Sequence, residues 1–369
     1  MQLRGEKMKK EVCFIISGTG YSGAEIVLNR YLEDNEYIDP YFLIIFNNKK
    51  VRKIYRDMYG EDKIKCLNII YNKNIFRFTI PLYIKLISNK LNKYFKSVNP
   101  EIIYVNNTCE GILCSKFINK SDKKSILHIH DMRECYKHPY NNYIIENYFK
   151  GYDKIITVSN ATKKSWNGLN MEVVYNGLKM DYFKGFEIID SVKEIAFIGS
   201  LNKRKGADYL IDSLDNLLIK TDVNITFVFR DYDKRMLNKL ELIESKRIKI
   251  LKNLSEYEIE NLYSNIDLII VPSRFDPLPT VIMEAEAKGK LVLGNNKYGI
   301  QEMINEKALL VDINSAKDLE EAIINTINMK RDKIIEYQYS LYNHSKKIYT
   351  SNNKKEKVNK IIDELISID

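Results

Sequence analysis

Short apolar runs alternate with longer amphipathic stretches along the whole chain. The clearest runs are the expected β-strands, and they lie at 11–16, 41–46, 100–107, 125–131, 152–159, 173–177, 194–199, 227–230, 266–271 and 291–294. Because stretches long enough for crossover helices separate most of them, the pattern predicts parallel sheets covered by helices, an α/β fold. Residues 178–192 have no clear periodicity, and we interpret them as a linker between two doubly wound domains at 8–177 and 193–348.

One stretch, 266–289, carries the strongest functional signal. The apolar run 266–271 is followed by a loop with Asp276, Leu278 and Pro279, and then by a helix that we expect to begin at the N-cap Thr280. A strand, a tight loop and a helix N-terminus form an anion site, because free backbone N–H groups and the helix dipole point to one spot. Asp276 and Glu284 add two carboxylates suited to sugar hydroxyls. The stretch therefore predicts a nucleotide-sugar pocket.

The segment PSRFDPLPTVIMEA within this stretch resembles the signature of family 4 glycosyltransferases, retaining enzymes of the GT-B fold. In that family an acidic residue, seven other residues and a glutamate precede an alanine. Asp276 stands where the family usually has Glu, and its side chain is one methylene shorter. The resemblance implies that Glu284 holds the donor ribose and that Asp276 contacts the transferred sugar. The alternative is an ordinary strand–helix unit with surface acids.

A glycine-rich loop follows the first strand and contains Gly18, Gly20 and Gly23. Glycines at the start of a helix allow the backbone to approach an anion closely. The spacing differs from the dinucleotide-binding pattern with its downstream acid, so nicotinamide binding is disfavoured. The loop resembles the first loop of the same glycosyltransferase family, which implies that Gly20 faces the donor. A turn that serves only packing is the alternative.

The second domain opens with a strand at 194–199 and a basic loop, which predict a second phosphate site. Gly199 and Lys205 match the family pattern. Ser200 stands where the family usually has an arginine, and we expect Lys203 or Arg204 to supply the missing charge. A weakly active or inactive member is the alternative.

Two histidines on one strand and a DxD triplet are the residues that could bind a metal ion. His128 and His130 lie on one face of the strand 125–131, and His130 matches the family histidine that touches the transferred sugar, whereas we expect His128 to pack inside. No third ligand is near in sequence. Asp231 and Asp233 form a DxD triplet, which in another glycosyltransferase class holds a metal ion. We interpret the triplet as an ordinary loop and predict a metal-independent protein without a cofactor.

The composition limits the cellular location and the classes of binding partner that we expect. The chain has 369 residues, 45% of them hydrophobic, and lacks an apolar run near the length of a membrane span or a signal-peptide cleavage site. Five cysteines without CxxC spacing indicate reduced thiols, so we expect a cytoplasmic protein. Lysines are dispersed despite a net charge of +9, and no nucleic-acid-binding motif accompanies them, so no nucleic acid is expected.

A basic amphipathic segment at 75–98 could form a peripheral contact with an anionic membrane at its inner face. Such a helix can equally pack on a sheet with its lysines facing water.

The resemblance covers nearly the whole chain and implies the GT-B fold, with two doubly wound Rossmann-like domains facing a cleft and a last helix at about 350–369 returning to the first domain. It implies a retaining glycosyltransferase that moves a sugar from a nucleotide-diphosphate sugar to a glycan or lipid-linked saccharide acceptor in cell-surface polysaccharide synthesis. Lys205 and the helix N-termini would stabilise the leaving diphosphate. A sugar-nucleotide epimerase of the same fold and a non-catalytic partner subunit are the alternatives.

Overall fold

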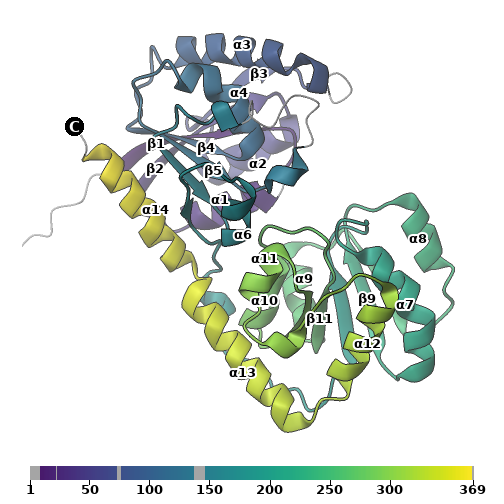
Figure 1. The fold of residues 1–369 in the computed structure, drawn as a ribbon. Coiled ribbons are helices and arrows are strands. Elements are labelled where there is room, and N and C mark those ends of the chain that lie inside the picture. The colour runs from purple at the N-terminus through teal and green to yellow at the C-terminus, as the bar shows by residue number, and fades with distance from the viewer. Residues whose placement is uncertain (1–8, 22, 73–75, 137–145, 368–369) are drawn as a thin grey trace, which may run out of the picture. The chain divides into compact units, whose positions relative to one another are not determined.

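The chain folds into two compact units, which Figure 1 shows as a ribbon. A computed structural model describes residues 9–21, 23–72, 76–136 and 146–367. Unit 1 comprises Met1–Gly177 and Ser351–Asp369, and unit 2 comprises Leu178–Thr350. Residues 178–192, expected to be a linker, thus belong to unit 2, where Phe183, Ile189 and Val192 are buried.

Unit 1 is built around a seven-stranded parallel sheet with the order β3-β2-β1-β4-β5-β6-β7. Its strands are β1 (Lys10–Ile16), β2 (Ile38–Phe46), β3 (Ile64–Ile69), β4 (Ile102–Asn106), β5 (Ser125–Ile129), β6 (Lys154–Thr157) and β7 (Glu172–Val173). Its helices are α1 (Gly23–Leu32), α2 (Lys49–Tyr59), α3 (Phe76–Tyr94), α4 (Thr108–Ile118), α6 (Asn160–Ser165), α14 (Ser351–Ile366) and the 3-10 helix η1 (Arg133–Cys135).

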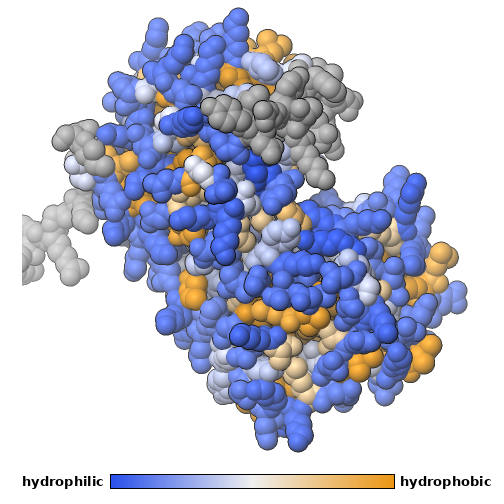
Figure 2. Space-filling view, in the orientation of Figure 1, coloured by the Kyte–Doolittle hydropathy of each residue, from blue (hydrophilic) through white to orange (hydrophobic). Residues whose placement is uncertain are grey.

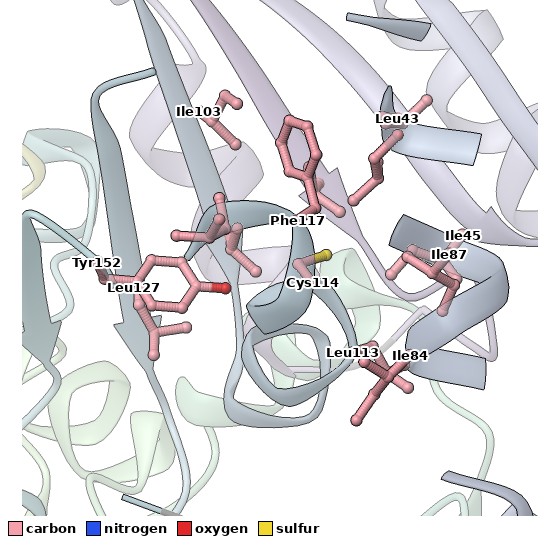
Figure 3. Packing of buried hydrophobic residues seen from close by; sticks show 14 of the residues in the cluster. Leu43, Ile45, Ile84, Ile87, Ile103, Leu113, Cys114, Phe117, Leu127 and Tyr152 are labelled. Atoms are coloured by element: carbon pink, nitrogen blue, oxygen red, sulfur yellow. The ribbon is translucent and has the colours of Figure 1, made fainter. Parts of the chain in front are cut away.

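Side chains that alternate along the strands of unit 1 enter two separate cores. Cys13 and Ile15 of β1 face the core that α3 and α4 cover, part of which Figure 3 shows. Val12 and Phe14 face the opposite core, which also contains Val358, Ile361, Ile362 and Leu365 of α14. The apolar stripe of the last helix therefore completes the core of the first unit.

Unit 2 has a six-stranded parallel sheet with the order β10-β9-β8-β11-β12-β13. Its strands are β8 (Glu194–Ile198), β9 (Asn224–Phe229), β10 (Ile248–Lys252), β11 (Leu268–Val271), β12 (Leu291–Asn295) and β13 (Leu310–Val311). Its helices are α7 (Ala207–Lys220), α8 (Lys234–Glu241), α9 (Glu256–Tyr263), α10 (Thr280–Ala287), α11 (Tyr298–Met303), α12 (Ala316–Ile327), α13 (Arg331–Ile348) and the 3-10 helices η2 (Met180–Tyr182) and η3 (Lys307–Leu309).

A carboxyl group is buried where α10 packs on α13. Glu286 has 0% exposure, and neither side-chain oxygen has a hydrogen-bond partner among the described residues. Burial raises the pKa of Glu286 well above its usual range, and Ser345 of α13 opposes this shift only in part. Burial therefore favours the protonated, neutral form of the Glu286 carboxyl group.

The predicted α/β class with two parallel, helix-covered sheets is confirmed. Three strands were missed: β3, β10 and the two-residue β13. The lysines of β3 and β10 interrupt their apolar pattern, which reads IKCLNI and IKILK. Among the described residues, no helix has the length and apolar content needed to cross a bilayer.

Candidate functional site

The loops after β8 and β11 meet at the carboxyl edge of the unit 2 sheet. The strand order reverses between these two neighbours, and in open α/β sheets ligands bind at such a switch point. The backbone N–H of Arg274 donates to the carbonyl of Arg204 at 2.9 Å. Gly206 has φ +71°, and a Cβ there would overlap the carbonyl oxygen of Pro272. The two loops thus pack backbone against backbone, which a glycine at this position permits.

An ion pair links the two loops. Lys205 Nζ donates to Asp276 Oδ2, with side-chain exposures of 22% and 5%. The backbone N–H of Lys205 donates to Asn202 Oδ1 at 3.0 Å, which holds the lysine at the end of its loop. Two residues predicted separately from the sequence, Lys205 and Asp276, are therefore in direct contact. A cation for phosphate and an acceptor for sugar hydroxyls lie side by side.

Arg274 supports this pair and was not singled out from the sequence as a site residue. Its guanidinium binds Asp208 through two hydrogen bonds of 2.6 and 2.8 Å and lies 3.6 Å from the ring centroid of Tyr209. It also donates to the carbonyl of Lys203 at 2.6 Å. Bidentate binding and stacking use the whole guanidinium plane, so Arg274 positions the basic loop. Asp208 lies 66 residues away in sequence, so only the fold brings the two together.

The residues expected to replace the family arginine are at the surface. The side chains of Lys203 and Arg204 are exposed. The start of the loop is fixed by Leu201, whose backbone N–H donates to the carbonyl of Asp231 at 2.8 Å and whose carbonyl accepts from the N–H of Asp233 at 2.9 Å. Gly199 precedes this anchor, and its N–H donates to Val228 O at 3.0 Å.

The helix after the second loop begins at Thr280, where its start was predicted, but its N-cap lies one residue earlier. Pro279, not Thr280, occupies the N-cap of α10, and no side chain caps the helix. The prediction of Thr280 as N-cap was wrong because Pro279 already provides the extended backbone that an N-cap needs. The first N–H groups of a helix lack intrahelical partners, so this end can receive an anion. Leu278 is buried just before it.

Glu284 follows on α10, half-buried, and Tyr263 donates its hydroxyl hydrogen to Glu284 Oε2 at 3.2 Å. The loop that carries Asp276 is also held from the other side, where Gly299 N–H donates to the Asp276 carbonyl at 3.0 Å. A Cβ on Gly299 would overlap Pro277 O, which explains the glycine.

His130 and Gly20 belong to unit 1. His130 is buried, and its Nε2 lies 3.0 Å from Asn106 Oδ1. Burial lowers the pKa of His130 to about 3, and the charge of Lys354 acts in the same direction, so the ring is neutral. A Cβ on Gly20 would meet nothing within 4 Å, so packing does not explain this glycine.

Two features considered as metal ligands have other contacts. His128 is 1% exposed, and its Nδ1 lies 2.6 Å from the hydroxyl oxygen of Tyr104. Asp233 is the N-cap of α8 and accepts from the backbone N–H groups of Arg235 and Met236. In the part of the chain that the structure describes, no three His, Cys, Asp or Glu side chains are placed to hold a metal ion.

Comparison with known proteins identifies the domain that carries this site. Residues 180–341 match the family described as "Glycosyl transferases group 1". An uncharacterized glycosyltransferase of Methanocaldococcus jannaschii is 24% identical over 42% of this chain and 45% of its own length. This chain thus spans less than half of that relative. An uncharacterized 41.2 kDa protein from the cps region of Klebsiella pneumoniae is 23% identical over 83% of this chain and 87% of its own.

A crystal structure of Anabaena HepE in complex with UDP and glucose shares the fold. Its TM-score is 0.76 with 17% identity, covering 96% of this chain and 100% of that one. Residues 180–341 therefore form a Glycosyl transferases group 1 domain, within a chain that has the GT-B fold.

Proposed function

We propose that the protein is a retaining glycosyltransferase of family 4 that transfers a sugar from a nucleotide-diphosphate sugar to a glycan or lipid-linked saccharide acceptor. The observation that carries this proposal is the Lys205–Asp276 ion pair at the switch point of unit 2. The leaving diphosphate needs a cation, and the transferred sugar needs hydrogen-bond acceptors for its hydroxyls. The pair supplies both in one place, beside the N-terminus of α10.

Glu284 extends the same site along α10. We assign it to the ribose hydroxyls of the donor, because a carboxylate accepts two hydroxyl hydrogens in a chelating geometry. The hydrogen bond from Tyr263 occupies one oxygen of Glu284 and fixes the orientation of its carboxylate. The relative from the cps region of Klebsiella pneumoniae supports a role in cell-surface polysaccharide synthesis.

The proposed reaction uses few protein groups directly. The bond between C1 of the sugar and the diphosphate oxygen breaks, and a bond from C1 to the acceptor oxygen forms on the same face. The proton of the acceptor hydroxyl passes to the leaving diphosphate, so no separate base is needed. Lys205 and the helix N-termini stabilise the charge that develops on the diphosphate, and the reaction requires no metal.

Analysis of the product by ¹H NMR tests this proposal. The protein is incubated with UDP-, GDP- and ADP-linked α-sugars, first alone and then with a panel of methyl glycosides and polyprenyl-linked saccharides as acceptors. We expect a new glycoside with an α-anomeric proton, formed only when an acceptor is present. A β-anomeric product contradicts the retaining mechanism. Conversion of the donor to its epimer without an acceptor supports the epimerase alternative, and donor binding without turnover supports the non-catalytic one.

We also propose a peripheral membrane contact for α3. Its sequence contains no acidic residue, and along its exposed face Lys85 and Lys93 accompany Leu82 and Leu86, which are 65% and 40% exposed. In Figure 2, apolar side chains lie among hydrophilic ones on the part of unit 1 that carries α3. Vesicle flotation tests this contact: we expect binding to vesicles with anionic lipid, reduced by Lys85→Glu together with Lys93→Glu. Equal binding of the variant contradicts it.

A further inference from the structure

The two ring nitrogens of His130 have different surroundings. The residue comes directly after β5, and β4 runs beside that strand, with Asn106 paired in register with His128. His130 Nε2 lies 3.0 Å from the side-chain oxygen Oδ1 of Asn106. Asn106 is 1% exposed, so water does not compete for this contact. The end of β4 therefore holds one nitrogen of the ring.

A second contact determines the orientation of the Asn106 amide. Its nitrogen Nδ2 donates to the backbone carbonyl of Ala24 at 3.4 Å. A carbonyl oxygen only accepts, so the amide nitrogen faces Ala24 and the amide oxygen faces His130. The reversed amide would place two oxygens together with no hydrogen between them. Ala24 thus decides which end of the amide His130 meets.

This orientation decides where the ring of His130 carries its proton. The amide oxygen only accepts, so Nε2 must carry a hydrogen. Burial lowers the pKa of His130 to about 3, and the charge of Lys354 on α14 acts in the same direction. A neutral imidazole has a single N–H, so Nδ1 keeps a lone pair.

The neighbouring side chains support the neutral ring. The ring of His128 stacks on that of His130 with 4.0 Å between the centroids, and burial lowers the pKa of His128 well below its usual range. Lys354 is 3% exposed, and its Nζ lies 3.4 Å from Asn176 Oδ1. A second proton on His130 would add a positive charge near Lys354 in a buried region.

The lone pair on Nδ1 is the part of the ring that remains for a ligand. No described residue forms a hydrogen bond with this nitrogen, and it is not one of the completely buried polar atoms, as His128 Nε2 is. A lone pair accepts a hydrogen from a sugar hydroxyl, whereas phosphate oxygens have no hydrogen to donate. This tautomer therefore suits a sugar hydroxyl and not the diphosphate.

We propose that Asn106 is a positioning residue that holds His130 in the tautomer with its proton on Nε2, so that Nδ1 accepts a hydrogen bond from one hydroxyl of the transferred sugar. The inference deepens the proposed function and rests on it, because it gives the sugar contact expected of His130 a direction. A donor sugar without that hydroxyl leaves the lone pair unpaired and is used less well.

The tautomer is measured first, on the full chain without ligand. A long-range ¹⁵N–¹H NMR spectrum distinguishes a ring nitrogen that carries a proton from one that does not, and the chain has four histidines. His130→Gln assigns the signals of His130. We expect the proton on Nε2 in the wild type and an increased fraction on Nδ1 in Asn106→Leu. A proton on Nδ1 in the wild type, or an unchanged spectrum in the variant, overturns the inference.

Donors that lack single hydroxyls test the contact with the sugar. The nucleotide sugar that the protein uses is compared with its monodeoxy derivatives. We expect one derivative to lose about tenfold or more in kcat/KM with the wild type. In Asn106→Leu that ratio should shrink to about twofold, because Nδ1 no longer accepts in a fixed geometry. A merely structural change would lower kcat/KM for every donor by the same factor and leave the ratio unchanged.

Thr157→Val is the matched control. The strand β6 flanks β5 on the side opposite β4, and Thr157 at its end is 0% exposed, with a hydroxyl that has no hydrogen-bond partner among the described residues. The control should keep both the tautomer and the donor ratio of the wild type. If Asn106→Leu does not fold, the spectrum and the donor ratios of the wild type still test the inference.

The outcomes separate this inference from the proposed function. If the wild type uses every monodeoxy donor as well as the parent, or if Asn106→Leu keeps the wild-type ratio, the inference is wrong while the proposed function stands. If no nucleotide sugar is turned over, the proposed function fails and the sugar contact fails with it. The spectrum of the free protein does not depend on turnover.

Discussion

Replacing Lys205 by alanine removes the cation that contacts Asp276 and tests the donor site most specifically. Charge on the diphosphate increases as the bond to C1 breaks, so the lysine stabilises the transition state more than the bound donor. Loss of one preorganised stabilising group typically costs about 2.7–4 kcal/mol in the activation free energy. We therefore expect Lys205→Ala to lower kcat about 100- to 1,000-fold, with a much smaller change in donor affinity.

The same change has a structural cost that must be measured separately. Asp276 is 5% exposed and would lose its counter-charge, while Lys205 is 22% exposed. Breaking a fully buried pair costs about 3–5 kcal/mol, and solvent screening at the lysine reduces this to about 1–2 kcal/mol. In the double variant with Asp276→Asn the uncompensated charge is gone, so much of the stability should return while turnover stays low.

Steady-state kinetics with saturating donor, together with urea unfolding, distinguish the two effects. Lys246→Ala is the control, since it removes an exposed lysine that precedes β10 at the amino end of the sheet, opposite the edge that carries the site. We expect the control to keep the wild-type unfolding free energy and most of its turnover. If Lys205→Ala turns over as fast as the wild type, the diphosphate does not bind beside this lysine. If stability and turnover return together in the double variant, the pair is only structural.

Three further changes probe the remaining groups. Glu284→Ala should weaken donor binding by about 1.5–3 kcal/mol in calorimetry, since a charge-assisted hydroxyl contact is lost; unchanged affinity contradicts its assignment to the ribose. For Glu286, burial raises the folded-state pKa above the unfolded one, so the folded state holds a proton that the unfolded state releases as pH rises. The unfolding free energy should therefore fall between pH 5 and 8 in the wild type and fall less in Glu286→Gln; parallel urea-unfolding curves at these pH values refute this. Activity should survive a chelator and Asp231→Ala, and loss of activity restored by manganese would indicate a metal-dependent mechanism.

The strand pattern and the two loop motifs could be read from the sequence because each depends on neighbours within about 20 residues. Lys205 and Asp276 were both predicted, and the structure adds that they touch. The two residues are 71 positions apart in the sequence, and hydrophobic periodicity does not predict contacts across such a separation. The strands β3 and β10 were missed because the prediction relied on continuous apolar runs, whereas polar residues interrupt IKCLNI and IKILK.

The hydrogen-bond partner of Arg274 and the burial of single carboxyl groups could not be predicted either, because both depend on contacts between residues far apart in the sequence. Arg274 stands in the loop of the signature stretch, but its partner Asp208 lies on α7. The sequence did not single out Glu286, and only the packed structure shows that its carboxyl group is buried. The N-cap of α10 is Pro279 and not the predicted Thr280. Proline and threonine both suit the start of a helix, and the sequence alone does not distinguish between them.

A thermal-unfolding panel shows whether a nucleotide-diphosphate sugar binds at the switch point of unit 2. The wild type and Glu284→Ala are each unfolded with UDP-, GDP- and ADP-sugars. At a ligand concentration of 100 Kd, binding adds about 2.7 kcal/mol to the unfolding free energy. We expect a clear rise in the Tm of the wild type with at least one donor, and a smaller rise for the variant. No shift with any donor, or an equal shift in both proteins, contradicts it.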